Sequence, residues 1–318
     1  MKILITGGTG FIGSYLAREL ISSGTDDIYL FDYYINRKRI TDLIDNSRIH
    51  IIQGDVAYWT DLISLFIKND FGSIFHFGSL MPPYTEEKLE KAFKINIQGT
   101  FYILELARLF NVPKVIYSSS GAIYGPGVDL PVTENTIRDP WTMYGVGKAI
   151  SEILGSYYDK RQNIQFIALR FPALIGPGRK GEGMTMWANN IIQYPAQSKK
   201  ATCNVESDVT VPILYIKDAT RLLTSLLNLE RIPHSAYNIN GDWLKAEDLE
   251  SLVKAEIPDA IIDYDPDPML TIQLKSWEMM KGDDSLIKRE LGFQPTYTPE
   301  GFVKDFIREV REKSYFQI

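Results

Sequence analysis

The sequence has little cysteine, no long apolar run and no excess of basic residues. Cys203 is the single cysteine among 318 residues, so no intrachain disulfide can form; without neighbours at metal-ligand spacing, it predicts a buried thiol and no metal site. No apolar run approaches the ~18 residues that a membrane span needs, and no signal-type leader precedes the first apolar run. The net charge of −6 argues against nucleic acid or an anionic membrane surface as a partner. We therefore expect a cytoplasmic protein that acts on a small molecule.

The first residues of the chain predict a nucleotide-binding turn. Residues 2–6 form an apolar run typical of a buried parallel strand, and a helical pattern follows over residues 14–22. Between them, Gly8, Gly10 and Gly13 match the dinucleotide fingerprint, and Gly7, Gly10 and Gly13 match its wider-spaced variant. Such glycines allow a tight turn and a close approach of the backbone to a pyrophosphate at the helix N-terminus. A purely structural strand-to-helix turn is the alternative.

An acidic residue ends the second predicted strand. Residues 28–31 are apolar, and Asp32 follows nineteen residues after Gly13. A carboxylate at this position accepts hydrogen bonds from the ribose hydroxyls and repels a 2′-phosphate, which favours NAD over NADP. The basic run Arg37, Lys38 and Arg39 could instead receive such a phosphate.

The next two predicted strands each bring a residue with two interpretations. Asp55 follows the strand at residues 49–53, and it can either hydrogen-bond the adenine amine or cap the helix that begins near Tyr58. His76 lies within the strand at residues 73–78, where a buried core histidine is favoured over a catalyst.

Strands and helices alternate along the first half of the chain. A helix over about 87–110, a strand at 114–117 and a strand at 165–170 continue the pattern. This order predicts an α/β fold with a doubly wound parallel (Rossmann) sheet that binds ligands at the carboxyl ends of its strands. We expect a dinucleotide-binding domain over 1–172, with a return at about 212–240. Residues 173–211 and 241–318 would then form a smaller, mixed substrate-binding lobe.

Three residues of the central region indicate proton-transfer chemistry. Tyr144 and Lys148 are four residues apart, so on a helix they share one face, where the ammonium favours the phenolate. Ser118, Ser119 and Ser120 follow the fifth strand toward the same crevice. A serine donor, a tyrosine base and a lysine that reaches the nicotinamide ribose would complete a site for hydride transfer. A surface Tyr–Lys pair and serines that bond the local backbone are the alternatives.

With these motifs the chain resembles the extended short-chain dehydrogenase/reductases, the NAD-dependent epimerase/dehydratase superfamily. The resemblance implies that Ser120, five residues before Gly125 of the Tyr-Gly pair, is the catalytic hydroxyl beside Tyr144 and Lys148. It also implies NAD as the cofactor and a homodimer formed through helices at about 88–110 and 144–161. The positions that would contact the cofactor are Gly7, Gly10, Phe11, Ile12, Gly13, Asp32, Asp55, Val56, Phe77, Gly78, Asn96, Ser118, Tyr144, Lys148, Phe171 and Pro172.

Two departures bear on the substrate. Nucleotide-sugar members of this superfamily typically carry Arg-Tyr-Phe-Asn and a later arginine for the diphosphate, whereas here Ala173 and Val211 occupy these positions. Arg170-Phe171-Pro172 and residues 142–146 are instead similar to short-chain-type L-threonine 3-dehydrogenases, and residues 187–205 resemble D-erythronate-type dehydrogenases. Of the polar residues in the Thr-Thr-Asp-Tyr-Ala stretch typical of the former group, only Thr185 remains.

We therefore expect an NAD-dependent oxidoreductase that oxidises a secondary alcohol of a small hydroxy or amino-hydroxy acid. Ser79, Ser120, Tyr144 and Thr185 would contact the substrate. Arg179 or Lys180, within residues 176–183, could close over it as a lid, or this segment could be a simple connector. A UDP-sugar 4-epimerase that retains its NAD, and a non-catalytic dinucleotide-binding protein, are the competing interpretations.

Overall fold

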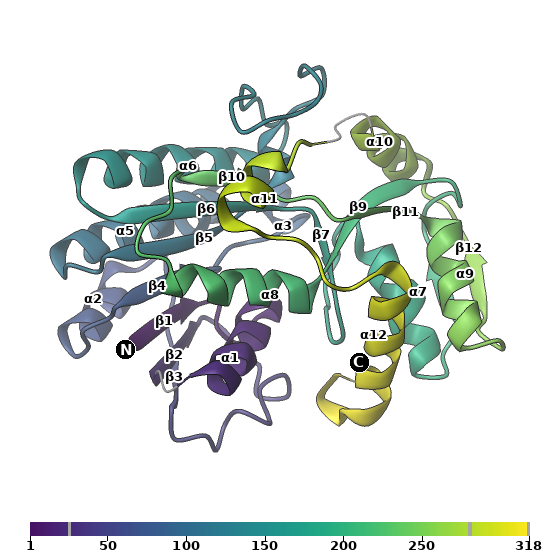
Figure 1. Ribbon diagram of the computed structural model, residues 1–318, viewed down its shortest axis with the longest axis horizontal. Coiled ribbons are helices and arrows are strands. Elements are labelled where there is room, and N and C mark those ends of the chain that lie inside the picture. The colour runs from purple at the N-terminus through teal and green to yellow at the C-terminus, as the bar shows by residue number, and fades with distance from the viewer. Residues whose placement is uncertain (25–26, 279–281, 317–318) are drawn as a thin grey trace.

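The computed structural model describes residues 1–24, 27–278 and 282–316. Its larger part is a seven-stranded parallel sheet in the order β10-β6-β5-β4-β1-β2-β3 (Figure 1). The strands are β1 (Lys2–Thr6), β2 (Asp27–Asp32), β3 (Ile49–Gln53), β4 (Ser73–His76), β5 (Lys114–Ser120), β6 (Gln165–Phe171) and β10 (Ala236–Asn238). The chain order reverses between β1 and β4, which is where doubly wound sheets bind their ligands. The predicted fold class is confirmed.

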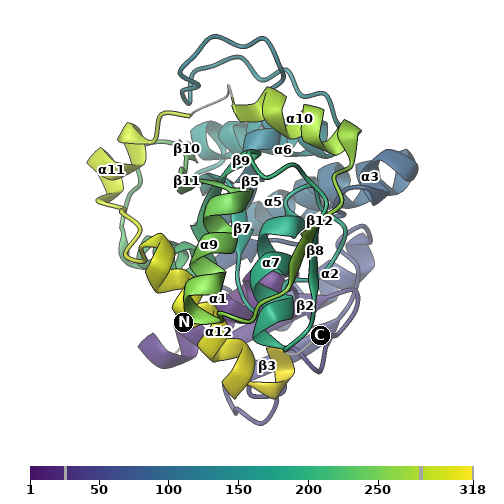
Figure 2. The same cartoon turned by 90° about the vertical axis from the view of Figure 1, so that its right-hand side faces the viewer.

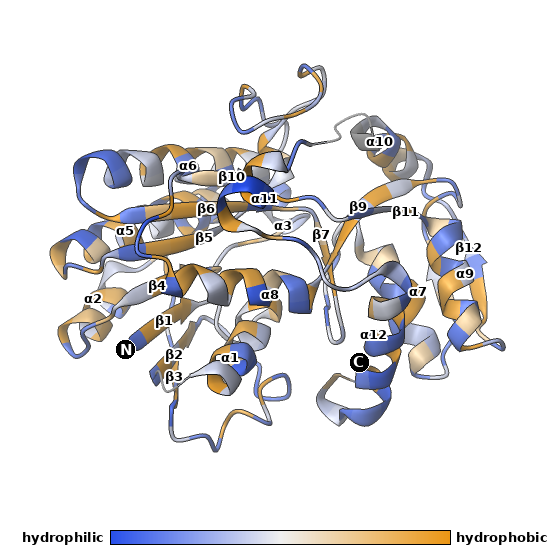
Figure 3. Cartoon of the chain, in the orientation of Figure 1, coloured by the Kyte–Doolittle hydropathy of each residue, from blue (hydrophilic) through white to orange (hydrophobic). Residues whose placement is uncertain are grey.

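Helices cover both faces of this sheet because the strands are apolar on both sides. In β1, Ile3 and Ile5 belong to the core that includes α1 (Phe11–Ser23) and α8 (Ile216–Ser225). Leu4, between them, belongs to the opposite core with α2 (Trp59–Ile67) and α5 (Gly99–Leu109). The long α6 (Met143–Arg161) packs beside α5 on that second face. Figure 3 shows the same pattern as hydrophobic colouring along the central strands.

The segment after β4 differs from the single helix predicted over about 87–110. A short helix, α3 (Tyr84–Glu87), ends at Lys88, whose φ of −130° and ψ of 64° are not helical. A second helix then runs without interruption through α4 (Leu89–Ala92), a π-helical segment (Phe93–Gln98) and α5. π-Helical turns are rare and frequently occur at functional sites.

The smaller lobe is built around two short sheets, and it lies at one end of the main sheet (Figures 1 and 2). β7 (Ala173–Ile175), β9 (Thr210–Tyr215) and β11 (Asp242–Lys245) form one sheet, and β8 (Ala201–Cys203) pairs with β12 (Ile262–Tyr264). Its helices are α7 (Met186–Ala196), α9 (Ala246–Glu256), α10 (Pro268–Glu278) and α12 (Pro299–Glu312), whereas α11 (Ser285–Leu291) packs against β10 at the edge of the main sheet. Short 3-10 turns occur at Gly121–Ile123, Leu226–Asn228 and Ser314–Phe316.

The segment expected to return to the first domain divides between the two sheets. β9 belongs to the small sheet, whereas α8 packs on α1 and β10 forms an edge of the main sheet. Within the described ranges, no helix is both long and apolar enough to cross a membrane.

Candidate active site

The loop after β1 has the geometry of a phosphate-binding turn. Gly7 adopts a φ of +66°, a conformation that favours glycine, and its carbonyl accepts a hydrogen bond from the Gly10 amide at 3.0 Å. A side chain at Gly7 would also collide with the backbone, because its Cβ would lie 2.9 Å from the Gly78 nitrogen. Helix α1 begins at Phe11, so its free N–H groups lie beside this turn.

Asp32 at the end of β2 is held by a residue that the sequence analysis did not single out. One oxygen of the Asp32 carboxylate accepts hydrogen bonds from both the amide and the hydroxyl of Thr9, each at 3.0 Å. Burial raises the pKa of Asp32, and the hydrogen bonds from Thr9 lower it. Thr9 lies within the glycine-rich turn, so it fixes the carboxylate next to the loop.

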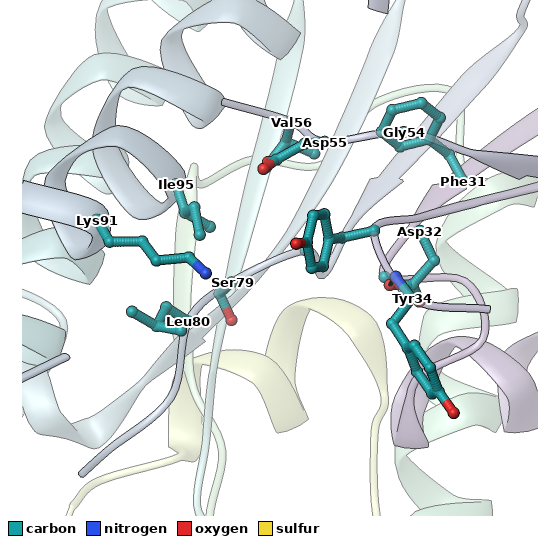
Figure 4. Close-up of a pocket in the computed structure, with 13 residues that line it drawn as sticks. Phe31, Asp32, Tyr34, Gly54, Asp55, Val56, Ser79, Leu80, Lys91 and Ile95 are labelled. Carbon is teal, nitrogen blue, oxygen red and sulfur yellow. Dashed lines mark hydrogen bonds between the residues drawn. The ribbon is translucent and has the colours of Figure 1, made fainter. Parts of the chain in front are cut away.

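A cavity of about 220 Å³ opens beside Asp32 (Figure 4). Its lining combines residues at and after the ends of four parallel strands with Lys91 and Ile95 of the following helix: Gly7, Phe31, Asp32, Tyr33, Tyr34, Gly54, Asp55, Val56, Gly78, Ser79, Leu80, Lys91 and Ile95. The Lys91 ammonium lies 5.5 Å from the centre of the Tyr33 ring, so the two side chains approach each other from opposite walls. Aromatic walls and one fixed carboxylate suit the adenosine half of a dinucleotide.

Asp55 can still either bind the adenine amine or cap the turn before α2. One carboxylate oxygen accepts a hydrogen bond from the Ala57 amide at 2.9 Å, in the turn before α2, while the residue also lines the cavity. Arg37, Lys38 and Arg39 were the alternative site for a 2′-phosphate. The Arg39 guanidinium already donates to the Gly178 carbonyl at 2.7 Å, which argues against that interpretation.

His76 is a core residue that positions the end of β4. Its side chain is buried, and its two ring nitrogens lie 2.6 Å from the Thr6 hydroxyl and 3.1 Å from the Thr100 hydroxyl. Burial lowers the pKa of His76 to about 3, so it stays neutral. The Thr6 hydroxyl also accepts the amides of Phe77 and Gly78, which fixes the two predicted cofactor contacts that follow β4.

Asn96 reaches the same region from the π-helical segment. Its side chain accepts the Leu80 amide at 2.7 Å and donates to the Leu80 carbonyl at 3.0 Å. Asn96 thus fastens the loop after β4 to the helix. Val56 is buried below this region, and Phe11 and Ile12 begin helix α1 and are partly buried.

The first turn of α6 presents Tyr144 to the crevice. The Thr142 hydroxyl caps the helix by accepting the Gly145 amide at 3.0 Å, and the Glu86 carboxylate accepts the amides of Met143 and Tyr144. A carboxylate at a helix N-terminus is favourable because it faces the positive end of the helix dipole. A side chain at Gly145 would collide with the Ala122 carbonyl, so this helix lies unusually close to the turn after β5.

Lys148 lies one turn further along and is buried. Its ammonium donates to the Ser118 carbonyl at 2.5 Å and lies 4.6 Å from the Tyr117 ring centre and 5.4 Å from that of Tyr144. Burial lowers the pKa of Lys148 to about 7, although the charge of Glu152 raises it. The Lys148 ammonium therefore loses its proton close to neutral pH.

Tyr144 differs in one respect from the expectation. Burial raises the pKa of Tyr144 to about 12, while a hydrogen bond with the Ser120 hydroxyl and the charge of Arg179 lower it. The Lys148 ammonium lies 5.4 Å from the centre of the Tyr144 ring. That it favours the phenolate stays a prediction, and Arg179 is a second positive charge that acts on the phenol.

The three serines lie inside β5 rather than after it, because β5 pairs with β6 as far as Ser120 and Phe171. Only Ser120 shares the crevice with Tyr144. Ser118 offers its carbonyl to Lys148, and the Ser119 hydroxyl donates to Glu152 at 2.5 Å. Each serine therefore has a different partner.

The four predicted substrate contacts fall into two groups. Ser120, Tyr144 and Thr185 form one group, because Ser120 hydrogen-bonds Tyr144 and the Thr185 hydroxyl accepts from Arg179, whose charge acts on Tyr144. Ser79 lines the cavity of Figure 4, and its hydroxyl points to the Met81 sulfur at 3.7 Å. Pro172 follows β6 directly and is half-buried.

With this geometry in place, comparison with known proteins decides the family. Residues 3–240 match the NAD dependent epimerase/dehydratase family. The chain belongs to this family. It is an enzyme of the extended short-chain type that uses a nicotinamide dinucleotide, as its motifs predicted.

Individual relatives include two kinds of dehydrogenase. The mitochondrial L-threonine 3-dehydrogenase of Bos taurus is 28% identical over 297 residues, which cover 92% of this chain and 78% of the relative. The D-erythronate dehydrogenase of Cupriavidus necator is 30% identical over 236 residues, 72% of each chain. The structure of L-threonine dehydrogenase from Clostridium difficile superimposes with a TM-score of 0.88 at 27% identity, covering 99% of this chain and 98% of that one. UDP-glucose 4-epimerase from Thermotoga maritima shares the fold, with a TM-score of 0.84 at 22% identity over 98% and 99% of the chains.

Proposed function

We propose that the protein is an NAD-dependent dehydrogenase that oxidises a secondary alcohol of a small hydroxy or amino-hydroxy acid. The observation that carries this proposal is the close grouping of Ser120, Tyr144 and Lys148, in a chain without the usual residues for a sugar diphosphate. Ala173 and the buried Val211 offer no charge where nucleotide-sugar enzymes carry asparagine and arginine. A diphosphate without such partners binds poorly in a partly dry site.

The residues of the site can divide the proton chemistry among them. The Ser120 hydroxyl orients the substrate alcohol, and Tyr144 as phenolate accepts its proton. Lys148, fixed by the Ser118 carbonyl, lies over the Tyr144 ring and would, when protonated, favour the phenolate and bind the cofactor ribose. When bound, the nicotinamide supplies the hydride acceptor.

The preference for NAD over NADP rests on Asp32. Its carboxylate is fixed by Thr9 at the edge of the cavity, where it would accept from ribose hydroxyls and repel a 2′-phosphate. The small lobe, residues 173–211 and 241–318, would bind the substrate through Thr185. Ser79, in the loop after β4, would be a second substrate contact.

The direct test is the absorbance of NADH formed by the purified protein with NAD and L-threonine, D-erythronate or UDP-glucose. We expect stoichiometric NADH from a small acid and none from the Tyr144→Phe variant. Interconversion of UDP-glucose and UDP-galactose without net NADH would instead establish the epimerase. Tight NAD binding with neither reaction would favour the non-catalytic alternative.

We further propose a homodimer formed through the helix at residues 89–109 and α6. Exposed apolar side chains gather on these helices: Leu89, Phe93, Phe101, Ile153 and Tyr157 are each 41–59% exposed. Such a cluster on adjacent helices indicates a protein interface, and a second copy would cover it by pairing the same two helices. The single, fully buried cysteine suits a reducing cytoplasm, where we place the enzyme.

A further inference from the structure

Arg179 lies in the loop between β7 and α7, and the backbone just before it is held on three sides. The amides of Gly176 and Gly178 donate to the buried side chains of Asn189 and Gln193, both at 3.0 Å. The Gly178 carbonyl accepts from Arg39 at 2.7 Å. The loop expected to be either a lid or a connector is therefore anchored where it leads into Arg179.

The guanidinium of Arg179 is only partly satisfied. Its Nη2 donates to the Thr185 hydroxyl at 3.3 Å, but the buried Nη1 atom has no hydrogen-bond partner among the described residues. No described acidic side chain pairs with it either. Because an unpaired buried charged group is costly, such an arrangement points to a partner that arrives from outside.

Arg170 shows how this chain satisfies an arginine whose role is structural. Its Nε and Nη2 both bond Glu152, and its Nη1 bonds the Tyr124 hydroxyl at 2.6 Å. Arg179 differs because its buried Nη1 has no such partner among the described residues. Burial lowers the pKa of Arg179 to about 10, and the charge of the nearby Tyr144 raises it.

We propose that Arg179, together with the Thr185 hydroxyl, binds the carboxylate of the substrate and selects hydroxy acids over neutral alcohols. A guanidinium presents parallel N–H donors that match the two oxygens of a carboxylate. Arg179 contacts Thr185 and is close enough to Tyr144 for their charges to interact, so the carboxylate would lie within a few bonds of the hydroxyl that Tyr144 deprotonates. This inference deepens the proposed function and rests on it.

The test measures binding of carboxylates without turnover. In the Tyr144→Phe protein saturated with NAD, titration calorimetry would compare L-threonine and D-erythronate with their carboxamides. We expect Arg179→Met to weaken binding of the better acid about 10- to 100-fold, the scale of a lost charged hydrogen bond, and to leave its amide unchanged. Arg179→Lys should fall between the two. Lys180→Met, an exposed cation on the same loop, is the matched control and should bind as the parent does.

Several results would overturn the inference. One is an equal loss of binding affinity for the acid and for its amide in Arg179→Met. Another is that the parent protein binds neither acid. A melting temperature several degrees lower for Arg179→Met would also overturn it, because it would indicate a structural role. Removing an unpaired buried cation that serves a ligand should leave the melting temperature equal or higher.

The outcome is separable from that of the proposed function. Arg179-dependent binding of a carboxylate, with no NADH formed when Tyr144 is present, would support the anion site and contradict the dehydrogenase. NADH formed from an acid with an unchanged KM in Arg179→Met would contradict the anion site alone.

Discussion

Glu152 and Arg170 form a two-point salt bridge in the interior, with Glu152 Oε1 2.9 Å from Nε and Oε2 2.7 Å from Nη2 of Arg170. Both side chains are 1% exposed. The pair joins α6, which carries Tyr144, to β6, which lies beside the serine-bearing β5. Besides the Ser119 hydroxyl, Arg138 from the loop before α6 also donates to this carboxylate, at 3.0 Å.

Replacing this carboxylate should strongly destabilise the protein. In Glu152→Gln the buried Arg170 loses its counter-charge, and breaking a buried pair in this way costs about 3–5 kcal/mol. Urea unfolding would measure the loss. Glu90→Gln, which removes an exposed partner of Lys94, is the control and should unfold as the parent does. Equal stability of the two variants would contradict the importance of the buried pair.

Buried Lys148 should make stability rise with pH. Its folded pKa of about 7 lies below the ordinary value of ~10.5, so between these values the unfolded chain binds one proton more. Unfolding free energy should therefore increase between pH 7 and 9 in the parent relative to Lys148→Met, by up to about 1.4 kcal/mol per pH unit. Above pH 10 the buried tyrosines oppose this trend. Parallel pH curves for both proteins would show that Lys148 is not buried as the structure places it.

Loss of the Tyr144 hydroxyl should abolish most of the activity but not the fold. We expect Tyr144→Phe to lower kcat by about 10²- to 10⁴-fold, the usual contribution of a positioned acid or base. Tyr157→Phe removes an exposed hydroxyl from the same helix and should retain full activity. Steady-state rates and melting temperatures of both variants decide the matter, and a similar loss in the two would contradict the assignment.

Cofactor choice should depend on Asp32. Asp32→Asn removes the charge that repels a 2′-phosphate, so NADPH should bind more tightly and NADH more weakly than in the parent, each by about tenfold. Fluorescence titration with both nucleotides measures the change. Asp55→Asn keeps an acceptor oxygen for the Ala57 amide and should preserve the preference for NADH.

The proposed dimer should fall apart when charge is placed in its interface. Phe93→Glu with Ile153→Glu would bury like charges in the assembly, and we expect a monomer by analytical ultracentrifugation. Ile137→Glu, at an exposed apolar position on the loop before α6, should leave the association unchanged. A parent protein that is monomeric at micromolar concentration would contradict the proposal.

The parts of the site that depend on short stretches of chain could be predicted from the sequence. β1, the glycine loop and Asp32 follow from local patterns, and Tyr144 and Lys148 follow from helical spacing. β5 was predicted too short because its last three residues are polar. Pairing with β6 keeps Ser118, Ser119 and Ser120 in the strand, and that pairing is not visible in a run of serines.

The remaining features depend on contacts between distant segments. Thr9 meets Asp32, Glu152 meets Arg170, and Arg179 meets the region of Tyr144 only once the sheet and the small lobe are assembled. Lys148 also shows why a pattern can identify a residue and miss its electrostatic role. Spacing places it near Tyr144, but burial sets its charge.

The number of residues in the π-helical segment at residues 93–98 sets the relative orientation of the side chains before and after it. A π-turn holds one residue more than an α-turn between the same ends. An alignment with a relative whose helix is regular would therefore need a single-residue gap in this stretch. Deleting one residue here would rotate one side of the helix by about 100° relative to the other. If Asn96 kept its hydrogen bond with Leu80, the helix beyond it would be rotated, and Phe101 would leave its exposed position. The extra residue of the π-helical segment therefore sets the orientation of two features at once: the loop beside the cofactor cavity and the surface proposed for dimerisation.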